Sequence, residues 1–185
     1  MSDASTPENT HPLNRTWTFH YFKPFAIQDK TADYSQQYDT VCDFSTAEDL
    51  VAVLKNIPNV ETLQVKSRLS IFESGIKPEW EDPHHLNGGR IRYEFTENAH
   101  STWENFLYFI LGEQLGEVGR IVTGIEVVPQ KGKRIRIDIW LRALEPTEVI
   151  DTIGNTLKSS LSLDQKLNFS PFEPEKHPHI SAKDF

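Results

Sequence analysis

The chain has 185 residues, of which 37% are hydrophobic and 25% charged, and its formal net charge at pH 7 is -8. This length predicts one domain with a full core. The single cysteine, Cys42, excludes an intrachain disulfide. No apolar run is long enough for a signal peptide or a membrane span. The acidic balance excludes broad, unspecific nucleic-acid binding, because a polyanion is repelled unless basic residues are concentrated locally. From the lone cysteine and the lack of such an apolar run, we expect a cytoplasmic protein, with a nuclear location as the second option.

The first half of the chain predicts an arm, three strands and a helix. Residues 1–10 are polar and aperiodic, so we expect a disordered arm. Residues 15–22 (RTWTFHYF) alternate between apolar and polar side chains, which predicts a strand, and shorter strands are predicted at 38–42 and 65–72. Between the strands predicted at 38–42 and 65–72, the sequence Ser-Thr-Ala-Glu at 45–48 is a capping box that predicts the start of a helix.

The second half predicts two strands and two helices. Residues 91–95 and 134–141 alternate cleanly and are predicted to be strands. A second capping box, at 101–104, opens a helix with apolar residues at i, i+3, i+4 and i+7, and a third helix is predicted from about Thr147. Short turns between paired strands, with helices spaced between the pairs, favour an α+β fold. In this fold a mainly antiparallel sheet carries its helices on one face, and the other face is free for a ligand.

The segment 73–90 (ESGIKPEWEDPHHLNGGR) is predicted to be a loop that places Trp80 beside Glu81. The ring offers a π face, and the carboxylate can accept two parallel N–H bonds, which is what the N1–H and amino edge of guanine presents. A plug over the core is the competing interpretation of Trp80, and from composition alone it is the commoner one.

The same segment contains three residues that could ligate a metal: Asp82, His84 and His85. Their spacing matches no standard zinc pattern, two of them are adjacent, and no cysteine lies near, so an ordinary surface loop is favoured. Cys42 lies in a predicted strand and is interpreted as a core residue.

A basic stretch, Lys131 to Arg136 (KGKRIR), precedes the last predicted strand. A solvated hairpin turn is one interpretation of it. However, alternation places Arg134, Arg136, Asp138 and Trp140 on the face opposite three isoleucines. Cations beside a flat ring suit a ligand with a base at one end and phosphates at the other.

Several short motifs occur in order along the chain: His11-Pro12-Leu13, Trp17, Gly75–Asp82 (GIKPEWED), Gly88-Gly89-Arg90, Leu111-Gly112-Glu113, Trp140 and Ile153-Gly154. Together they resemble the translation initiation factor 4E family, whose members bind the 7-methylguanosine cap of messenger RNA. The resemblance implies a cap-binding domain over residues 11–163. Residues 164–185 are then a C-terminal extension that completes the domain and is partly mobile.

The family resemblance implies a single-domain, curved antiparallel sheet with three helices on its convex face and a cap cleft on its concave face. Trp80 matches the second of two rings that sandwich the base, Glu81 the carboxylate that reads the guanine edge, and Trp140 a ring near the methyl group. Tyr34 stands where the first ring is normally a tryptophan. A tyrosine stacks less area, so we expect cap binding to be retained but weaker.

The resemblance also implies basic residues that hold the cap phosphates. Arg90 matches a family arginine near the phosphates. The following hairpin differs in length from the family pattern, so its basic residues have no one-to-one match: Arg136 is the best candidate, Lys131 is the next, and Arg134 is a third. Gln130 falls where the family often has an arginine, which puts one phosphate contact in doubt.

On the convex face, the family docks a helical Tyr-x-x-x-x-Leu peptide from a scaffold initiation factor of the 4G type or from a 4E-binding repressor. The implied contact residues are His11, Pro12, Leu13, Val51, Glu104, Leu107 and Tyr108. Val51 replaces a central tryptophan and Glu104 an apolar residue. We therefore expect the usual peptide to bind poorly, or a partner with a non-standard motif.

The function implied by the resemblance is cap binding in cap-dependent translation initiation, without catalysis and without a cofactor. Two alternatives stay open. One is a cap-binding competitor, repressor or storage factor that does not engage the usual scaffold, which Val51 and Glu104 favour. The other is an enzyme acting on nucleotides with a metal at Asp82, His84 and His85, which little favours.

Overall fold

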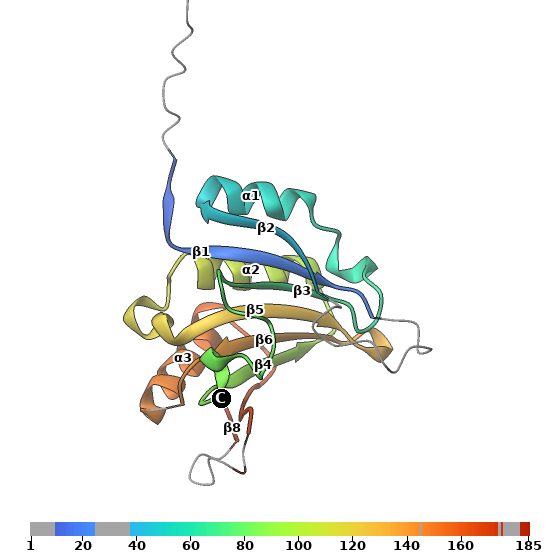
Figure 1. The fold of residues 1–185 in the computed structure, drawn as a ribbon. Coiled ribbons are helices and arrows are strands. Elements are labelled where there is room, and N and C mark those ends of the chain that lie inside the picture. The colour runs from blue at the N-terminus through green and yellow to red at the C-terminus, as the bar shows by residue number, and fades with distance from the viewer. Residues whose placement is uncertain (1–9, 25–37, 145, 174, 176–181) are drawn as a thin grey trace, which may run out of the picture.

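The computed structural model describes residues 10–24, 38–144, 146–173, 175 and 182–185. Tyr34 and all but Thr10 of the predicted N-terminal arm lie outside these ranges. Within them the chain forms one eight-stranded sheet with three α-helices (Figure 1). The strands are β1 (Pro12–Phe22), β2 (Tyr38–Thr46), β3 (Arg68–Glu73), β4 (Gly89–Phe95), β5 (Val122–Pro129), β6 (Ile135–Leu141), β7 (Leu167–Pro171) and β8 (Lys183–Asp184), and the α-helices are α1 (Ala47–Asn56), α2 (Ala99–Leu111) and α3 (Thr147–Ser160). In the described part of the chain, no helix is long and apolar enough to cross a membrane.

The strands follow the order β2-β1-β3-β5-β6-β4-β7-β8 across the sheet, and every neighbouring pair is antiparallel. This confirms the predicted α+β fold with a mainly antiparallel sheet. A short turn at Lys131–Lys133 joins β5 to β6, and Gly132 adopts a φ of 75° there, which glycine tolerates best. β7 and β8 extend the sheet beyond β4, so the C-terminal part of the chain belongs to it.

The predicted strands all occur, but some of their ends differ. β2 continues to Thr46 instead of residue 42, and β3 begins at Arg68 instead of residue 65. The alternation rule misses β5 because all eight of its residues are buried, and its sequence VTGIEVVP lacks the pattern of a half-buried strand. β8 has two residues, too few for any periodicity.

Helix α1 begins one residue later than its capping box predicts. Its N-cap is Thr46, whose hydroxyl accepts a hydrogen bond from the Asp49 N–H at 3.1 Å, so the prediction of Ser45 as the cap is wrong. Glu48 accepts a bond from the His11 N–H at 3.0 Å and lies 2.7 Å from the ring Nδ1 of the same residue. These contacts tie the start of the folded chain to α1, and they lower the pKa of the Glu48 carboxyl to about 2.

Helix α2 begins before its capping box. Asn98 precedes it in a left-handed conformation, with no side-chain cap bond, and Ser101 lies within the first turn, so the prediction of Ser101 as the cap is wrong. The Ala99 N–H is instead bound by the Glu61 carboxylate at 3.1 Å, a partner distant in sequence. Helix α3 begins at Thr147, as predicted.

All three α-helices pack on one face of the sheet, as predicted, and α2 lies behind the strands in Figure 1. The strand residues that face the helices are apolar: Ile135, Ile137 and Ile139 of β6 are buried there together with the apolar stripe of each helix. Cys42 is half-buried and packs against this core, in line with its interpretation as a core residue. Because side chains alternate along a strand, the residues between the isoleucines belong to the opposite face.

The opposite face carries a smaller apolar cluster. Phe72, Ile76 and Trp140 form it, and Phe172 packs against it. The register partner of Phe72 on β5 is Gly124, and a Cβ on that glycine would lie 2.4 Å from the phenyl ring. The glycine therefore lets Phe72 lie over β5 and meet Trp140 edge to face, with 5.4 Å between the ring centroids.

Candidate ligand-binding site

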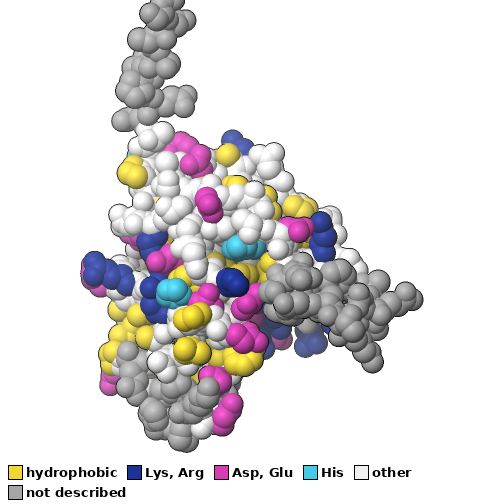
Figure 2. Space-filling view, in the orientation of Figure 1, with side chains coloured by type: hydrophobic (Ala, Val, Ile, Leu, Met, Phe, Trp, Pro, Cys, Tyr) yellow, Lys and Arg dark blue, Asp and Glu magenta, His cyan; other side chains and the backbone are white. Residues whose placement is uncertain are grey.

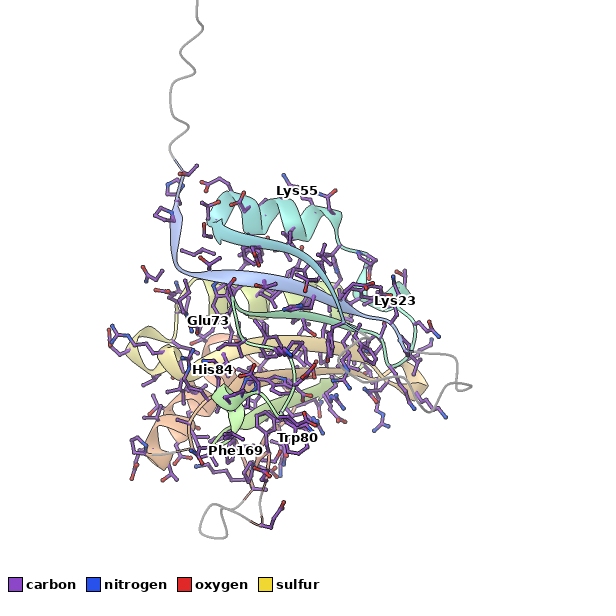
Figure 3. All side chains as sticks on the ribbon, in the orientation of Figure 1. Lys23, Lys55, Glu73, Trp80, His84 and Phe169 are labelled. Carbon is purple, nitrogen blue, oxygen red and sulfur yellow. The ribbon has the colours of Figure 1, made fainter. Side chains whose placement is uncertain are left out.

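A cavity of about 510 Å³ lies on the face of the sheet that the helices leave uncovered, within the range of about 300 to 1,000 Å³ that is typical of small-ligand sites. Figure 3 labels Trp80, on the loop between β3 and β4, and Figure 2 shows hydrophobic side chains beside charged ones of both signs. The lining residues are Arg68, Pro78, Glu79, Trp80, Glu81, Arg90, Trp140, Pro171, Phe172, Glu173 and Glu175. Four glutamates against two arginines make this lining acidic on balance.

Trp80 lies in the cavity wall with 47% of its surface exposed, and it belongs to neither buried cluster. The interpretation of this ring as a plug over the core therefore does not hold. Its neighbour Glu81 is exposed and forms no hydrogen bond or ion pair with any residue that the structure describes. A π face and an unpaired carboxylate thus lie next to each other at the cavity.

Asp82 shapes the loop that carries these two side chains. Its buried carboxylate accepts hydrogen bonds from the N–H groups of Lys77 and His84, each at 2.9 Å, and lies 2.7 Å from the His84 Nδ1. Burial alone would raise the pKa of Asp82, but these bonds outweigh it and the pKa is lowered. The carboxylate therefore stays ionised and closes the loop on itself.

The three residues considered as metal ligands have other partners. Asp82 and His84 bind each other, whereas His85 is fully buried and its ring nitrogens lie close to the Glu79 carbonyl and the Thr123 hydroxyl. No group of three or more His, Cys, Asp or Glu that could hold a metal occurs within the described ranges. The expectation of an ordinary surface loop is wrong for His85 and Asp82, which are both buried, and holds for the exposed His84.

Trp140 forms the floor of the cavity. Its ring is 3% exposed, and its centroid lies 4.6 Å from that of Phe172 and 5.1 Å from that of His85. The indole Nε1 is buried and has no hydrogen-bond partner among the described residues, which is uncommon for a buried tryptophan. Trp140 thus closes the cavity from below, while Trp80 stands at its side.

Arg90 lies on β4 beside Trp140, its register partner on β6. Its Nε is buried without a hydrogen-bond partner, and the guanidinium forms no ion pair within the described residues. Burial lowers the pKa of Arg90, and the nearby Asp138 carboxylate acts in the opposite direction. Because an arginine stays charged at neutral pH, this unpaired cation in the wall can bind a phosphate or a carboxylate.

The other three basic candidates do not line the cavity. Arg136 is 18% exposed and pairs with a buried aspartate at 2.9 Å. Arg134 is 3.8 Å from a glutamate of β4, and Lys131 is exposed in the turn between β5 and β6. Of the four basic candidates, the structure brings Arg90 alone to Trp80 and Glu81.

Two buried carboxylates lie on neighbouring strands of the face of the sheet that the helices leave uncovered. Glu126 of β5 and Asp138 of β6 are register partners, and both are fully buried. Arg92 donates to Asp138 at 2.7 and 3.2 Å, and Arg68 lies 3.5 Å from Glu126. Burial raises the pKa of Glu126, and the Arg68 cation opposes that shift. Asp138 thus has two cationic partners, Arg92 and, at 2.9 Å, Arg136, and Arg90 is left to face the cavity.

Sequence reasoning missed Arg68 and the segment after β7. Arg68 lies on the same face of the strand RLSIF as Ser70 and Phe72. The alternation pattern could therefore have placed it on the face of the sheet that holds the cavity. Phe172 carries no such signal, because it follows the short strand β7 and precedes no periodic element.

The residues predicted to contact a protein partner lie on α1, on α2, or at and immediately before the start of β1: His11, Pro12, Leu13, Val51, Glu104, Leu107 and Tyr108. Val51 and Tyr108 are 37% and 46% exposed, which is high for apolar and aromatic side chains. Leu107 is fully buried, so it can support such a surface from beneath but does not form part of it.

The family model described as eukaryotic initiation factor 4E matches residues 12–184. The chain is 34% identical over 160 residues to eukaryotic translation initiation factor 4E-2 of Schizosaccharomyces pombe, which covers 85% of this chain and 64% of that protein. It is 30% identical over 188 residues to eukaryotic translation initiation factor 4E of Saccharomyces cerevisiae, which covers 98% of this chain and 86% of that protein.

Among the solved structures that share the fold are two complexes of similar chains. One is the complex of C. elegans eIF4E-3 with the 4E-binding protein Mextli and a cap analog, with a TM-score of 0.82 and 27% identity, covering 94% of this chain and 99% of that chain. The other is the complex of Ascaris suum eIF4E-3 with m7G cap, with a TM-score of 0.81 and 26% identity, covering 88% of this chain and 92% of that chain. By sequence and by fold, the chain belongs to the eukaryotic initiation factor 4E family.

Proposed function

We propose that this protein binds the 7-methylguanosine cap of messenger RNA in the cavity beside Trp80 and acts in cap-dependent translation initiation. The observation that carries the proposal is the meeting of three side chains at one cavity: the half-exposed Trp80 and the charges of Glu81 and Arg90, which have no ion-pair partner among the residues that the structure describes. Solved complexes of similar chains with a cap analog and with m7G cap support it.

The base half of the ligand fits Trp80 and Glu81. Methylation at N7 gives guanine a positive charge, so stacking on an indole adds a cation–π attraction of roughly 0.5 to 2 kcal/mol. The acidic lining also favours a cation. The Glu81 carboxylate can accept both the N1–H and the amino N–H of the guanine edge.

Two further rings complete the base site in this proposal. Trp140, in the floor, offers an apolar contact for the methyl group. Tyr34 is proposed as the ring that faces Trp80 across the base; it lies outside the residues that the structure describes.

The phosphates are proposed to bind Arg90 first, because this cation already lines the cavity. Arg136 would share its charge between a phosphate and its present aspartate partner. Lys131 and Arg134, both exposed, would reach the later phosphates through their long side chains. Residues 11–185 act as one binding unit in this proposal, and the site performs recognition without catalysis.

We also propose a protein partner for the helical side, of the scaffold or 4E-binding type. Val51 of α1 and Tyr108 of α2 supply exposed apolar surface there, and His11 is held to α1 by Glu48. Support comes from the similar chain that was solved with the 4E-binding protein Mextli. The non-standard Val51 and Glu104 point to a partner motif that differs from the usual peptide.

Retention on a resin that carries 7-methylguanosine triphosphate tests the cap proposal. We expect wild type to bind, Trp80→Ala to lose retention with the stack, and Glu81→Gln to lose it because an acceptor becomes partly a donor facing guanine's own donors. Glu97→Gln is the matched control, since Glu97 is also exposed and lies outside this cavity. Undiminished retention of Trp80→Ala or Glu81→Gln would show that the assigned role is wrong.

A further inference from the structure

His85 is a fully buried histidine on the loop that carries Trp80 and Glu81. It does not line the cavity, so the recognition of a base or a phosphate makes no direct use of it. Buried histidines cost free energy unless both ring nitrogens find partners. The partners of this ring connect two parts of the site that are far apart in sequence.

One ring nitrogen of His85 holds the loop, and the other holds the sheet. Nδ1 lies 2.7 Å from the carbonyl oxygen of Glu79, the residue immediately before Trp80. Nε2 lies 2.9 Å from the hydroxyl of Thr123, in β5. The imidazole is thus a bridge between the backbone at the base-binding pair and the strand beneath the cavity.

The proton positions follow from the chemistry of these partners. A carbonyl can only accept a hydrogen bond, so Nδ1 must carry a proton. With a neutral ring, Nε2 then accepts the single hydroxyl proton of Thr123, which could otherwise go to the Trp140 carbonyl at 3.2 Å. The Nδ1–H tautomer therefore satisfies the loop and the strand together.

Aromatic rings hold His85 on its remaining sides. The ring centroids of Trp140, Phe172 and Phe72 lie 5.1, 5.8 and 6.0 Å from that of His85. Trp140 and Phe172 line the cavity. A change in the imidazole therefore acts on the cavity floor as well as on the loop.

Several contacts hold the loop that carries Trp80 and Glu81, among them the packing of Ile76 against Phe72 and Trp140. Asp82 closes the loop on one side through the N–H groups of Lys77 and His84. That closure is internal to the loop and does not fix its distance from the sheet. The bonds of His85 to Glu79 and Thr123 join the backbone immediately before Trp80 directly to β5.

We propose that His85 is a positioning residue, which sets Trp80 and Glu81 at their distance from Trp140 by holding the Glu79 carbonyl to β5. The inference rests on the proposed function of the cavity for its effect on affinity. Its structural part, the placement of the loop, concerns the free protein and can be measured without a ligand.

Three substitutions separate the two hydrogen bonds. His85→Asn places an amide N–H where Nδ1 stands and keeps the bond to Glu79 but not the strand bond to Thr123. His85→Gln places its amide where Nε2 stands and keeps the bond to Thr123 but not the loop bond. Thr123→Val removes the strand bond with little change of volume and serves as a second route if a His85 variant fails to fold.

The test uses two readouts on the full chain. In the free protein, the Trp80 indole N–H resonance, assigned with Trp80→Phe, reports the loop position. With 7-methylguanosine triphosphate as the probe, titration reports affinity. We expect His85→Asn and His85→Gln, each of which breaks one end of the bridge, to shift the resonance and to bind roughly tenfold or more weakly, as the loss of a buried hydrogen bond predicts. Thr123→Ser keeps the hydroxyl and should match wild type in both readouts. Thr123→Val should shift the resonance in the same direction.

Two outcomes would overturn the inference: an unmoved Trp80 resonance in both His85→Gln and Thr123→Val, or a Thr123→Ser variant as impaired as Thr123→Val. If wild type itself fails to bind the probe, the proposed function fails instead, and the Trp80 resonance still decides whether His85 positions the loop.

Discussion

At the scale of single residues, the site depends on charges that have no partner inside the described protein. Glu81 and Arg90 are such groups, although they line a cavity that also contains buried aromatic surface. Elsewhere on the same face the charges are paired, as Asp138 is with Arg92. A ligand with a cationic, donor-rich end and an anionic end would satisfy both unpaired groups at once.

Arg90 gives the first prediction. Arg90→Gln should lower the affinity for 7-methylguanosine triphosphate roughly tenfold or more, since a charge-assisted hydrogen bond is lost, but should leave the affinity for the nucleoside 7-methylguanosine nearly unchanged. Titrations of both compounds measure the two effects. Arg120→Gln, at an exposed surface pair with Glu117, is the control. Equal losses for nucleoside and triphosphate would contradict a phosphate role for Arg90.

His85 gives a prediction about pH. Burial lowers its pKa below the ordinary value of 6.5; the Glu79 carbonyl and Asp82 oppose this shift, and the charges of His84 and Arg142 add to it. As the pH falls below about 6.5, His85 is therefore protonated in the unfolded chain while it stays neutral in the folded chain. The free energy of unfolding decreases as a result.

Urea denaturation of wild type and His85→Asn at pH 7.5 and pH 5.5 measures this linkage. Wild type should lose more stability than the variant between the two pH values, because the variant lacks the titrating ring. The same loss in both proteins would mean that His85 titrates alike in the folded and unfolded chains.

At the scale of elements, the start of a helix is set either by neighbouring residues, as in α1, or by residues distant in sequence, as in α2. Helix α1 provides a test, because two neighbouring residues compete for one role. Thr46→Ala should destabilise the fold by about 1 kcal/mol through the lost N-cap bond, whereas Ser45→Ala should change stability by less than about 0.5 kcal/mol. Urea denaturation of both variants measures their free energies of unfolding. A larger loss of stability in Ser45→Ala than in Thr46→Ala would show that Ser45 is the cap after all.

The elements with a clear period could be predicted from the sequence, and those built by distant contacts could not. β1, β4 and β6 alternate because one face of the sheet meets the helices and the other does not, and on β4 and β6 that second face carries Arg90 and Trp140 of the cavity. β5 is buried throughout and has no period. The start of α2 depends on Glu61, and no local pattern identifies a carboxylate 38 residues away.

The site divides in the same way. Trp80, Glu81, Arg90 and Trp140 were accessible from motifs and alternation, and all four line one cavity. Phe172 and His85 were not. Their contribution arises from the packing of the loop and the segment after β7 around Trp140, which a linear pattern does not encode.

At the scale of the whole molecule, the sheet separates two surfaces. The helices cover one face and expose Val51 and Tyr108, and the other face holds the cavity. With a net charge of -8 the chain as a whole repels RNA. Binding of a messenger RNA must therefore come from the chemistry of its modified end and not from general attraction to the phosphate backbone.

The most direct test of this account is titration of the wild-type protein with guanosine triphosphate and with 7-methylguanosine triphosphate under the same salt and pH. The two ligands share phosphates, sugar and guanine edge, and differ in the methyl group and its positive charge. We predict that the methylated ligand binds at least about tenfold more tightly, because each stacked ring contributes roughly 0.5 to 2 kcal/mol of cation–π attraction. Equal affinities for the two ligands would contradict a cap-binding site built on Trp80 and Glu81.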